Sequence, residues 1–584
     1  MKKPSLLFAG TLAAVLAVGG VWSVRGEVSI KGEIEIRLDD SGSSASGAGV
    51  DISGDEIAIH SAGVYHLTGA LSDGQVQVKV GKKDHVTLIL DGVVISNGSG
   101  AAIFVKNAGQ TILQLAEDSV NRICSGMPVE LSANAADDSA SGGAIHAKDD
   151  LTIEGAGRLT VLGYVNNGIH CSNQLEITGG ELTVEAVNNG VKGKDGVTIS
   201  GGSLSIRSGG DGIDSDADDG RGYGVINIAG GELDIESFGD GMQAATALTV
   251  SGGSVNIVSG GGSAAAAPKQ SKERWNRDEN RDRDDESDAV SSKGLKASTL
   301  LTISGGKISI DAADDALHSD GEVSITGGML TLSTGDDGIH ADDSLGISSG
   351  LIVIERSYEG LEANQILISG GEIDLNADDD GLNANGGQSF MGRGFRGHGG
   401  FGGRDGFGGD WSDAPQTQIE SEPLLTLRIT GGALHINAEG DGLDSNGDLI
   451  VEGGEIVVDG PSRSGNGALD SGSESGGICL VHGGTVLAIG SSGMAETFDE
   501  GSEQYSFCYN FSDALAAGSG ISVADADGNV LFAHTAAKSF SSVVFSSPDL
   551  VPGESYMLTA GDQTAEILLD AVSTQSGERS RWGR

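Results

Sequence analysis

Apolar and polar residues alternate in short stretches over most of the chain, and these stretches recur with a fixed period. From Gly143 to about Gly490, each copy holds a small polar or acidic turn, a Gly-Ile or Gly-Leu step, an alternating apolar strand, a Gly-Gly pair and another such strand. Several successive copies are 22 residues apart. The aligned first positions are Gly168, Gly190, Gly212, Gly241, Gly294, Ala316, Gly338, Gly360, Gly381 and Gly442. Such a period predicts a solenoid of stacked β coils.

The copy at residues 335–354 illustrates the geometry expected of one coil. Ile339 and Ala341 should face one way and His340 and Asp342 the other, because side chains alternate along a strand. Two further alternating stretches follow, so each coil of about 22 residues holds three short strands. The Gly-Gly pairs mark tight corners, where a side chain would clash or a positive φ is needed.

One coil cannot bury its inner face alone, so equivalent apolar residues of neighbouring coils must cover it. Ile325, Ile347 and Ile368 are expected to form one such stack. A right hand follows from the usual handedness of parallel strand connections. The sequence therefore predicts an all-β fold, a right-handed parallel β-helix with terminal caps and two disordered inserts.

The pattern divides the chain into five segments. These are 1–26, a signal peptide or membrane anchor; 27–140, an N-terminal cap and irregular early coils; 141–490, the β-helix repeats with inserts at 263–289 and 386–423; 491–575, C-terminal coils and a β-rich cap; and 576–584, a tail. A basic start followed by an apolar stretch is typical of export, although the stretch is long enough to serve as an uncleaved anchor. We therefore expect an extracellular or cell-surface protein of a bacterium.

The composition adds a strong negative charge to this picture. The formal net charge is −49, and the acids recur as short Asp and Asn clusters between apolar strands. Such a surface repels nucleic acid, so we expect no nucleic-acid partner. The four cysteines are too few and scattered for a disulfide scaffold, and only Cys479 and Cys508 lie near each other in sequence. We expect buried free thiols.

Acidic and amide residues fall at three repeated positions of the copies, one place before the aligned residue and two and four places after it. Stacked carboxylates would repel each other by roughly 1 kcal/mol or more without a cation between them. Calcium suits such a site because it accepts six to eight oxygens in loose geometry. The predicted calcium ligands are Asp211, Asp214, Asp216, Asp240, Asp314, Asp315, Asp320, Asp336, Asp337, Asp342, Asp343, Asp380, Asp441 and Asp444.

Two other interpretations of these positions stay open. Asp and Asn are also good turn residues between strands, and this role alone explains single positions well. His318 and His340 share the outward position on adjacent copies and could bind zinc. Solvated surface histidines are the more common outcome, and we expect it here.

Segments outside the strict repeat carry a family resemblance. They are Tyr65 to Gly69, Val86 to Gly92, Gly100 to Ile103, Leu115 to Asn121 and Pro552 to Gly561, and they accompany the Asp-Asp-Gly-Ile-His-Ala-Asp run at 336–342. With these runs the chain resembles a bacterial family of calcium-rich parallel β-helix carbohydrate-binding proteins, related in shape to pectate lyases. The resemblance implies several calcium ions, a plant-type or acidic polysaccharide as partner, and no catalytic residue.

We therefore expect a monomeric, calcium-stabilised protein that binds polysaccharide without cutting it. The first alternative is a calcium-dependent, pectate-type lyase, which would need an Arg or Lys as base. Lys192, Lys194, Lys293 and Lys296 are candidates, although salt bridges to neighbouring carboxylates are the plainer role for them. A structural or adhesive surface stalk is the second alternative, since it needs nothing beyond the solenoid.

Overall fold

The computed structural model describes residues 32–133, 142–218, 220–266, 290–385, 425–473 and 476–578. The predicted signal or anchor at 1–26, nearly all of the insert at 263–289, the insert at 386–423 and the end of the tail lie outside these residues. No helix within the described ranges combines the length and the apolar character needed to cross a membrane.

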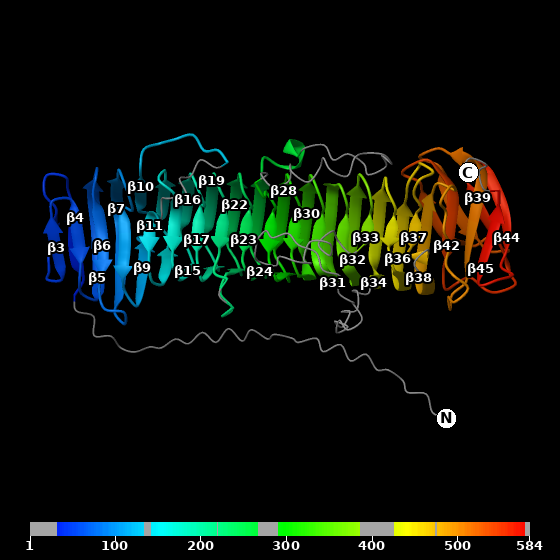
Figure 1. Ribbon diagram of the computed structural model, residues 1–584, viewed down its shortest axis with the longest axis horizontal. Helices are drawn as coiled ribbons and strands as arrows, with labels where there is room; N and C mark the ends of the chain where they lie inside the picture. Colours follow the sequence, from blue (N-terminus) through cyan, green and yellow to red (C-terminus); the bar gives the residue numbers. More distant parts are fainter. Residues whose placement is uncertain are drawn as a thin grey trace, which may run out of the picture.

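The described chain is all-β and elongated, with strands stacked side by side along its longest axis (Figure 1). A short 3-10 turn spans Ser263–Ala265. Most strands pair in parallel with an equivalent strand of the next repeat, which produces three ladders that run along the stack. A long, parallel-dominated sheet follows from this pairing.

The first ladder contains the strands that begin each repeat. It runs through β4 (Glu56–Ile59), β6 (Gln75–Lys79), β8 (Ile103–Asn107), β11 (Gly143–Ala147), β14 (Asn167–Cys171), β17 (Val191–Gly193), β20 (Ile213–Ser215), β23 (Met242–Ala244), β26 (Leu295–Ala297), β29 (Leu317–Ser319), β31 (Ile339–Ser357), β32 (Leu361–Ala377), β33 (Leu382–Ala384), β35 (Leu443–Ser445) and β37 (Leu469–Ser471).

The second ladder follows one corner later in each repeat. It runs through β7 (His85–Asn97), β9 (Gln110–Leu115), β12 (Leu151–Gly155), β15 (Gln174–Ile177), β18 (Gly196–Ile199), β21 (Val225–Ile228), β24 (Ala247–Val250), β27 (Leu300–Ile303) and β30 (Glu322–Thr334), then β31, β32, β34 (Thr426–Ala438), β36 (Asp448–Asp459) and β38 (Cys479–Gly490).

The third ladder completes each repeat. It runs from β7 through β10 (Val120–Ser125), β13 (Arg158–Gly163), β16 (Glu181–Ala186), β19 (Ser203–Ser208), β22 (Glu232–Ser237), β25 (Ser254–Ser259) and β28 (Lys307–Ala312) to the later halves of β30, β31, β32, β34, β36 and β38. These long strands turn a corner without a break, and β31 and β32 pass through all three ladders.

Antiparallel strands lie at both ends of the stack. At the start, β1 (Ile34–Leu38) pairs with β2 (Ser44–Ala45), β3 (Val50–Ser53) pairs with β4, and β5 (Gly63–Leu71) joins β1 to β7. At the end, β38 pairs antiparallel with β42 (Phe540–Ser546), which also pairs antiparallel with β39 (Ser506–Leu515), and β39 pairs in parallel with β45 (Ser573–Gly577). A separate four-stranded sheet contains β40 (Gly520–Ala524), β41 (Val530–Thr535), β43 (Ser555–Ala560) and β44 (Gln563–Leu568).

Apolar ladders fill the interior as the alternation predicts. Ile325 pairs with Ile347, which pairs with Ile368, and all three side chains are buried. The cysteines are all free and buried, which confirms that prediction.

The Gly-Gly corners have the predicted geometry. Gly371, the second glycine of its pair, has a φ of +95°, and a Cβ there would lie 3.2 Å from the carbonyl oxygen of Gly350. A side chain at this corner would therefore be strained both by its backbone conformation and by the strand of the adjacent repeat.

Candidate functional site

The outward side chains of the first ladder form one continuous column in strict register. Ala58 and Gln77 begin it, and the members that follow are Phe104, His146, His170, Lys192, Asp214, Gln243, Lys296, His318, His340, Glu362, Asn383, Asp444 and Asp470. The strand pairing from His170 to Asp444 follows the order predicted from the sequence repeat and confirms that prediction. Phe104, His146 and Asp470 were missed because the flanking repeats have different lengths.

A second column contains the residue that lies three positions before each member of the first column. Hydrogen bonds from backbone N–H groups to side-chain oxygens connect its members. The N–H of Asp211 donates to Asn189 Oδ1 over 2.9 Å, and the N–H of Asp240 donates to Asp211 Oδ1 over 2.9 Å. The same bond joins Asp441 to Asp380 Oδ1 over 2.7 Å. In each pair a side-chain oxygen accepts from the backbone of the next repeat, so these bonds join neighbouring repeats and do not close a turn within one. The other oxygen can face a cation.

Lysines supply positive charge in the first predicted stretch, around Asp211, Asp214, Asp216 and Asp240. Lys192 Nζ lies 2.6 Å from Asp214 Oδ2 and 2.7 Å from Asp216 Oδ2. Lys296 Nζ lies 3.4 Å from Asp240 Oδ2. The salt-bridge role expected of Lys192 and Lys296 is confirmed, and the protein places its own cations among these acids.

The second predicted stretch extends from Asp314 to Asp343. Positively charged side chains also lie beside its acids, and the first of these is a lysine. Lys293 Nζ lies 3.0 Å from Asp314 Oδ2 and 2.6 Å from Asp315 Oδ2. Oxygens of Asp314, Asp315 and Asp336 lie within 4.8 Å of one another. Asp343, in contrast, is an exposed residue of β31.

His318 and His340 are stacked, with ring centroids 4.9 Å apart, and the prediction that they are solvated is wrong. Their side chains are only 13% and 17% exposed, because carboxylates enclose both rings. His318 contacts Asp315 and Asp320 at 2.8 and 3.0 Å.

The second ring, that of His340, contacts three carboxylates. Asp337, Glu362 and Asp342 lie 2.9, 3.0 and 3.2 Å from its nitrogens. Burial opposes protonation of His340, but hydrogen bonds to these carboxylates outweigh it and raise its pKa. The imidazolium form makes His340 a further internal cation.

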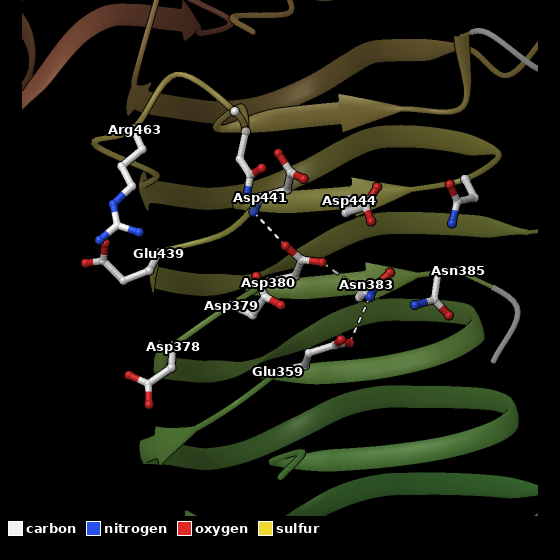
Figure 2. A pocket seen from close by; sticks show the side chains of 13 residues that line it. Glu359, Asp378, Asp379, Asp380, Asn383, Asn385, Glu439, Asp441, Asp444 and Arg463 are labelled. Atoms are coloured by element: carbon white, nitrogen blue, oxygen red, sulfur yellow. Dashed lines mark hydrogen bonds between the residues drawn. The ribbon is translucent and has the colours of Figure 1, made fainter. Parts of the chain in front are cut away.

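The third stretch differs because its acids line an open cleft of about 610 Å³ (Figure 2). Seven acidic residues and one arginine line it together with small and amide residues. The lining residues are Glu359, Asp378, Asp379, Asp380, Asn383, Asn385, Glu439, Asp441, Asp444, Asn446, Arg463, Gly465 and Asn466. Figure 2 shows their side chains reaching the cleft from successive repeats.

The carboxylates in this cleft are poorly neutralised by the described residues. Burial and the neighbouring Asp441 and Asp379 raise the pKa of Asp380 to about 8. Burial and Asp441 likewise raise the pKa of Asp444 to about 8. The pKa of Asp441 is raised to about 7, mainly by burial. Groups of this kind take up either a proton or a metal cation near neutral pH.

Asn383, which also lines the cleft, has a buried side-chain oxygen without a hydrogen-bond donor among the described residues. Its side chain is 2% exposed, and its amide nitrogen donates to Glu359 Oε2 over 2.8 Å. A buried acceptor without a partner costs about 1–3 kcal/mol. Carboxylate and amide oxygens are the ligands that calcium prefers. The residues that could hold a calcium ion here are Asp380, Asn383, Asp441 and Asp444.

The repeat pattern predicted the acidic residues of the cleft that occupy repeated positions. It did not predict several other residues that line the cleft. Glu439, Arg463, Gly465 and Asn466 lie outside the three aligned positions. The step from Leu443 to Leu469, which pair in the first ladder, is 26 residues (469 − 443) instead of 22. This longer repeat was the available signal that an extra loop borders the site.

Comparison with known proteins finds similarity to part of the chain, between residues 53 and 338. Residues 53–338 match the family model described as carbohydrate-binding domain-containing protein. A protein of Acetivibrio thermocellus with the same description is 38% identical over 138 residues, which is 24% of this chain and 48% of that protein. The chain thus spans about half the length of this curated relative.

A solved structure is also similar in sequence. It is named the polysaccharide lyase-like protein from C. thermocellum, gadolinium derivative, and is 35% identical. The match covers 39% of this chain and 92% of that one, with a TM-score of 0.37. Over residues 53–338, the chain is therefore similar to proteins described as containing a carbohydrate-binding domain.

Proposed function

We propose that this protein binds polysaccharide without cleaving it, and that calcium held in the acidic cleft helps to bind acidic sugars. The family match supports carbohydrate binding for residues 53–338. The cleft lies beyond that segment, but its column residues Asn383 and Asp444 continue the same outward column that includes His170 and Lys192. One long face would therefore present both regions to a chain-like ligand.

The three ladders support a finer proposal for the fold. Parallel pairing between equivalent strands of successive repeats, with a glycine corner between ladders, supports the proposal of a parallel β-helix. We propose a right-handed helix on the general rule for parallel connections. Export to the cell surface, with residues 1–26 as signal or anchor, and a monomeric state belong to the same proposal.

The observation that carries the calcium proposal is the contrast between the three acidic stretches. Lys192, Lys293 and His340 place positive charge among the first two. In the cleft, seven acidic residues share the lining with Arg463. We therefore propose calcium first for Asp380, Asp441 and Asp444. A bound ion with open coordination positions could then bridge to sugar carboxylates.

Binding without catalysis is favoured by the state of two lysines. A lyase needs a base that can lose its proton near the working pH. Burial lowers the pKa of Lys192 and of Lys293, but their paired aspartates outweigh burial and raise both values. Neither lysine is suited to remove a proton from a sugar. A calcium-dependent lyase remains the second candidate because Arg463 lies in the cleft with the acids.

Affinity chromatography with simultaneous detection of product separates these functions. The full chain would be passed over immobilised polygalacturonate, cellulose and a neutral glucan, with calcium or with chelator, while absorbance reports unsaturated sugars. Retention on polygalacturonate with calcium and without product is expected. Product formation would establish the lyase instead, and passage through every column would contradict both functions and favour a surface stalk.

A further inference from the structure

Two histidines and an aspartate meet where the parallel ladders join the C-terminal sheet. His435 lies on β34, Asp459 at the end of β36 and His534 on β41. The Nε2 atoms of His435 and His534 lie 3.2 and 2.9 Å from the same oxygen, Asp459 Oδ2. All three candidate donor atoms lie within 4.8 Å of one another. Strands far apart in the sequence therefore bring two imidazoles and one carboxylate to one point.

The surrounding contacts orient this cluster. The N–H of Ala537 donates to Asp459 Oδ1 over 2.9 Å, so only Oδ2 faces the two rings. Asp374 Oδ1 lies 3.1 Å from His435 Nδ1 and can accept its proton in a hydrogen bond. A carboxylate on the far nitrogen of a metal-binding histidine fixes the ring and directs the lone pair of Nε2 toward the metal.

We propose that His435, Asp459 and His534 bind a transition-metal ion, with zinc as the best fit. Zinc accepts imidazole nitrogen and carboxylate oxygen at about 2.0–2.2 Å in tetrahedral geometry. Ligand atoms in such a site are separated by roughly 3.4 Å, so the observed 2.9 and 3.2 Å need only a small outward shift. The oxygen-only cleft, in contrast, suits calcium.

Burial gives the site a closed side and an open side. Asp459 is fully buried and the His534 side chain is 17% exposed, whereas the His435 side chain is 44% exposed. The ion would thus take three protein ligands, with the fourth position open to water or another donor beside His435. This arrangement leaves both imidazoles neutral, with Asp374 accepting the remaining proton of His435.

The three proposed metal ligands come from two different sheets, so a bound ion would connect these sheets. His435 and Asp459 belong to neighbouring parallel strands, whereas His534 belongs to the four-stranded antiparallel sheet. A metal ion would cross-link that sheet to the last repeats. Because an ion that binds only the folded state stabilises it by mass action, zinc should raise the melting temperature.

The test uses the full chain, freed of metal by a chelator and titrated with zinc chloride alone. Bound zinc would be counted by elemental analysis after gel filtration for the wild type, His435→Gln, His534→Gln and the control His85→Gln, whose side chain is exposed. Glutamine keeps an N–H that can donate to Asp459, so the contact between the sheets survives while the zinc ligand is lost. We expect each cluster variant to lose one bound equivalent and the zinc-dependent melting shift, and His85→Gln to keep both.

Equal zinc content in the wild type and His534→Gln would overturn the site, as would a wild type that binds none. X-ray absorption at the zinc edge of the wild type gives a readout that needs no variant, and two imidazole ligands are expected. Asp380→Asn/Asp444→Asn should retain this zinc, so failure of the calcium cleft and failure of the zinc site are distinguishable.

Discussion

At the scale of single residues, the central feature is how each buried carboxylate of the outward columns is balanced. Asp214 is 3% exposed and meets Lys192, and Asp315 is 3% exposed and meets Lys293. A carboxylate taken out of water is tolerated only with such a partner. Asp380 and Asp444 lack a comparable partner among the described residues, and burial raises both pKa values to about 8. Burial also raises the pKa of Asp214 and, to about 8, that of Asp211, so the absence of a paired cation and not the pKa shift distinguishes the cleft.

Removal of one internal cation should expose this balance. In Lys192→Met, Asp214 keeps its hydrogen bond from Asn189 Nδ2 but loses the ammonium group. We expect the free energy of unfolding to fall by roughly 1–3 kcal/mol, the cost of a buried polar group without its partner. Urea unfolding measures this loss. The control Lys194→Met, at an exposed position of the next turn, should change stability by less than about 0.5 kcal/mol.

The cleft carboxylates predict an unusual dependence of stability on pH. The folded pKa values of Asp380 and Asp444, about 8, lie above the unfolded value of 3.8. Between these values the folded state binds more protons than the unfolded state, so the free energy of unfolding falls as pH rises. Calcium-free protein should therefore melt at a lower temperature at pH 8 than at pH 5.

The matched comparison is Asp380→Asn/Asp444→Asn, in which neither side chain ionises. This variant should show a smaller loss of melting temperature over the same pH range, and calcium should reduce the loss in the wild type. Identical pH profiles of the wild type and the variant would show that the two carboxylates do not govern the effect.

At the scale of the strand, stability comes from apolar ladders that run through successive repeats. Ile347 on β31 is 1% exposed and lies between Ile325 and Ile368 of the neighbouring repeats. Ile347→Ala should lower the free energy of unfolding by about 2–5 kcal/mol, because it leaves a cavity between two layers. Leu367→Ala is the control on the outward side of β32, where the residue is 46% exposed, and should cost far less.

The strand pattern could be read from the sequence because a period of two fixes which side chains face inward. Misplacing the register by one residue would turn every buried Ile and Leu to the surface. The predicted order from His170 to Asp444 is therefore found in the strand pairing. The antiparallel strands β40, β41, β43 and β44 carry no such period, so their mutual pairing could not be derived in the same way.

The site was predictable only where it follows the repeat. Asp380, Asp441 and Asp444 occupy repeated positions, and the structure brings them into one cleft. The enclosure of His340 by carboxylates of adjacent repeats was not predictable, because it depends on side-chain burial and not on spacing. The same holds for His435 and His534, which are 99 residues apart (534 − 435) and meet only through the packing of the end sheet.

At the scale of the whole molecule, the stack converts a repeated sequence into a long outward face whose charge changes along its length. Histidines and lysines predominate over the part that matches the carbohydrate-binding family model, from His146 to His318, where Asp214 is the single acid of the column. Acids and amides follow from Glu362 to Asp470. A polysaccharide that lies along this face would meet protein cations in one region and the proposed calcium in the other.

The proposed calcium ion in the cleft is the central claim, and calorimetric titration of chelator-treated full-length protein with calcium at pH 7 tests it most directly. The wild type should bind calcium and release protons. The carboxyl groups of Asp380 and Asp444 have pKa values of about 8 and must ionise to coordinate the ion. Asp380→Asn/Asp444→Asn should lose this binding, while the exposed-site control Asp562→Asn retains it. Equal calcium binding by the wild type and the double variant, or none by the wild type, would contradict the account.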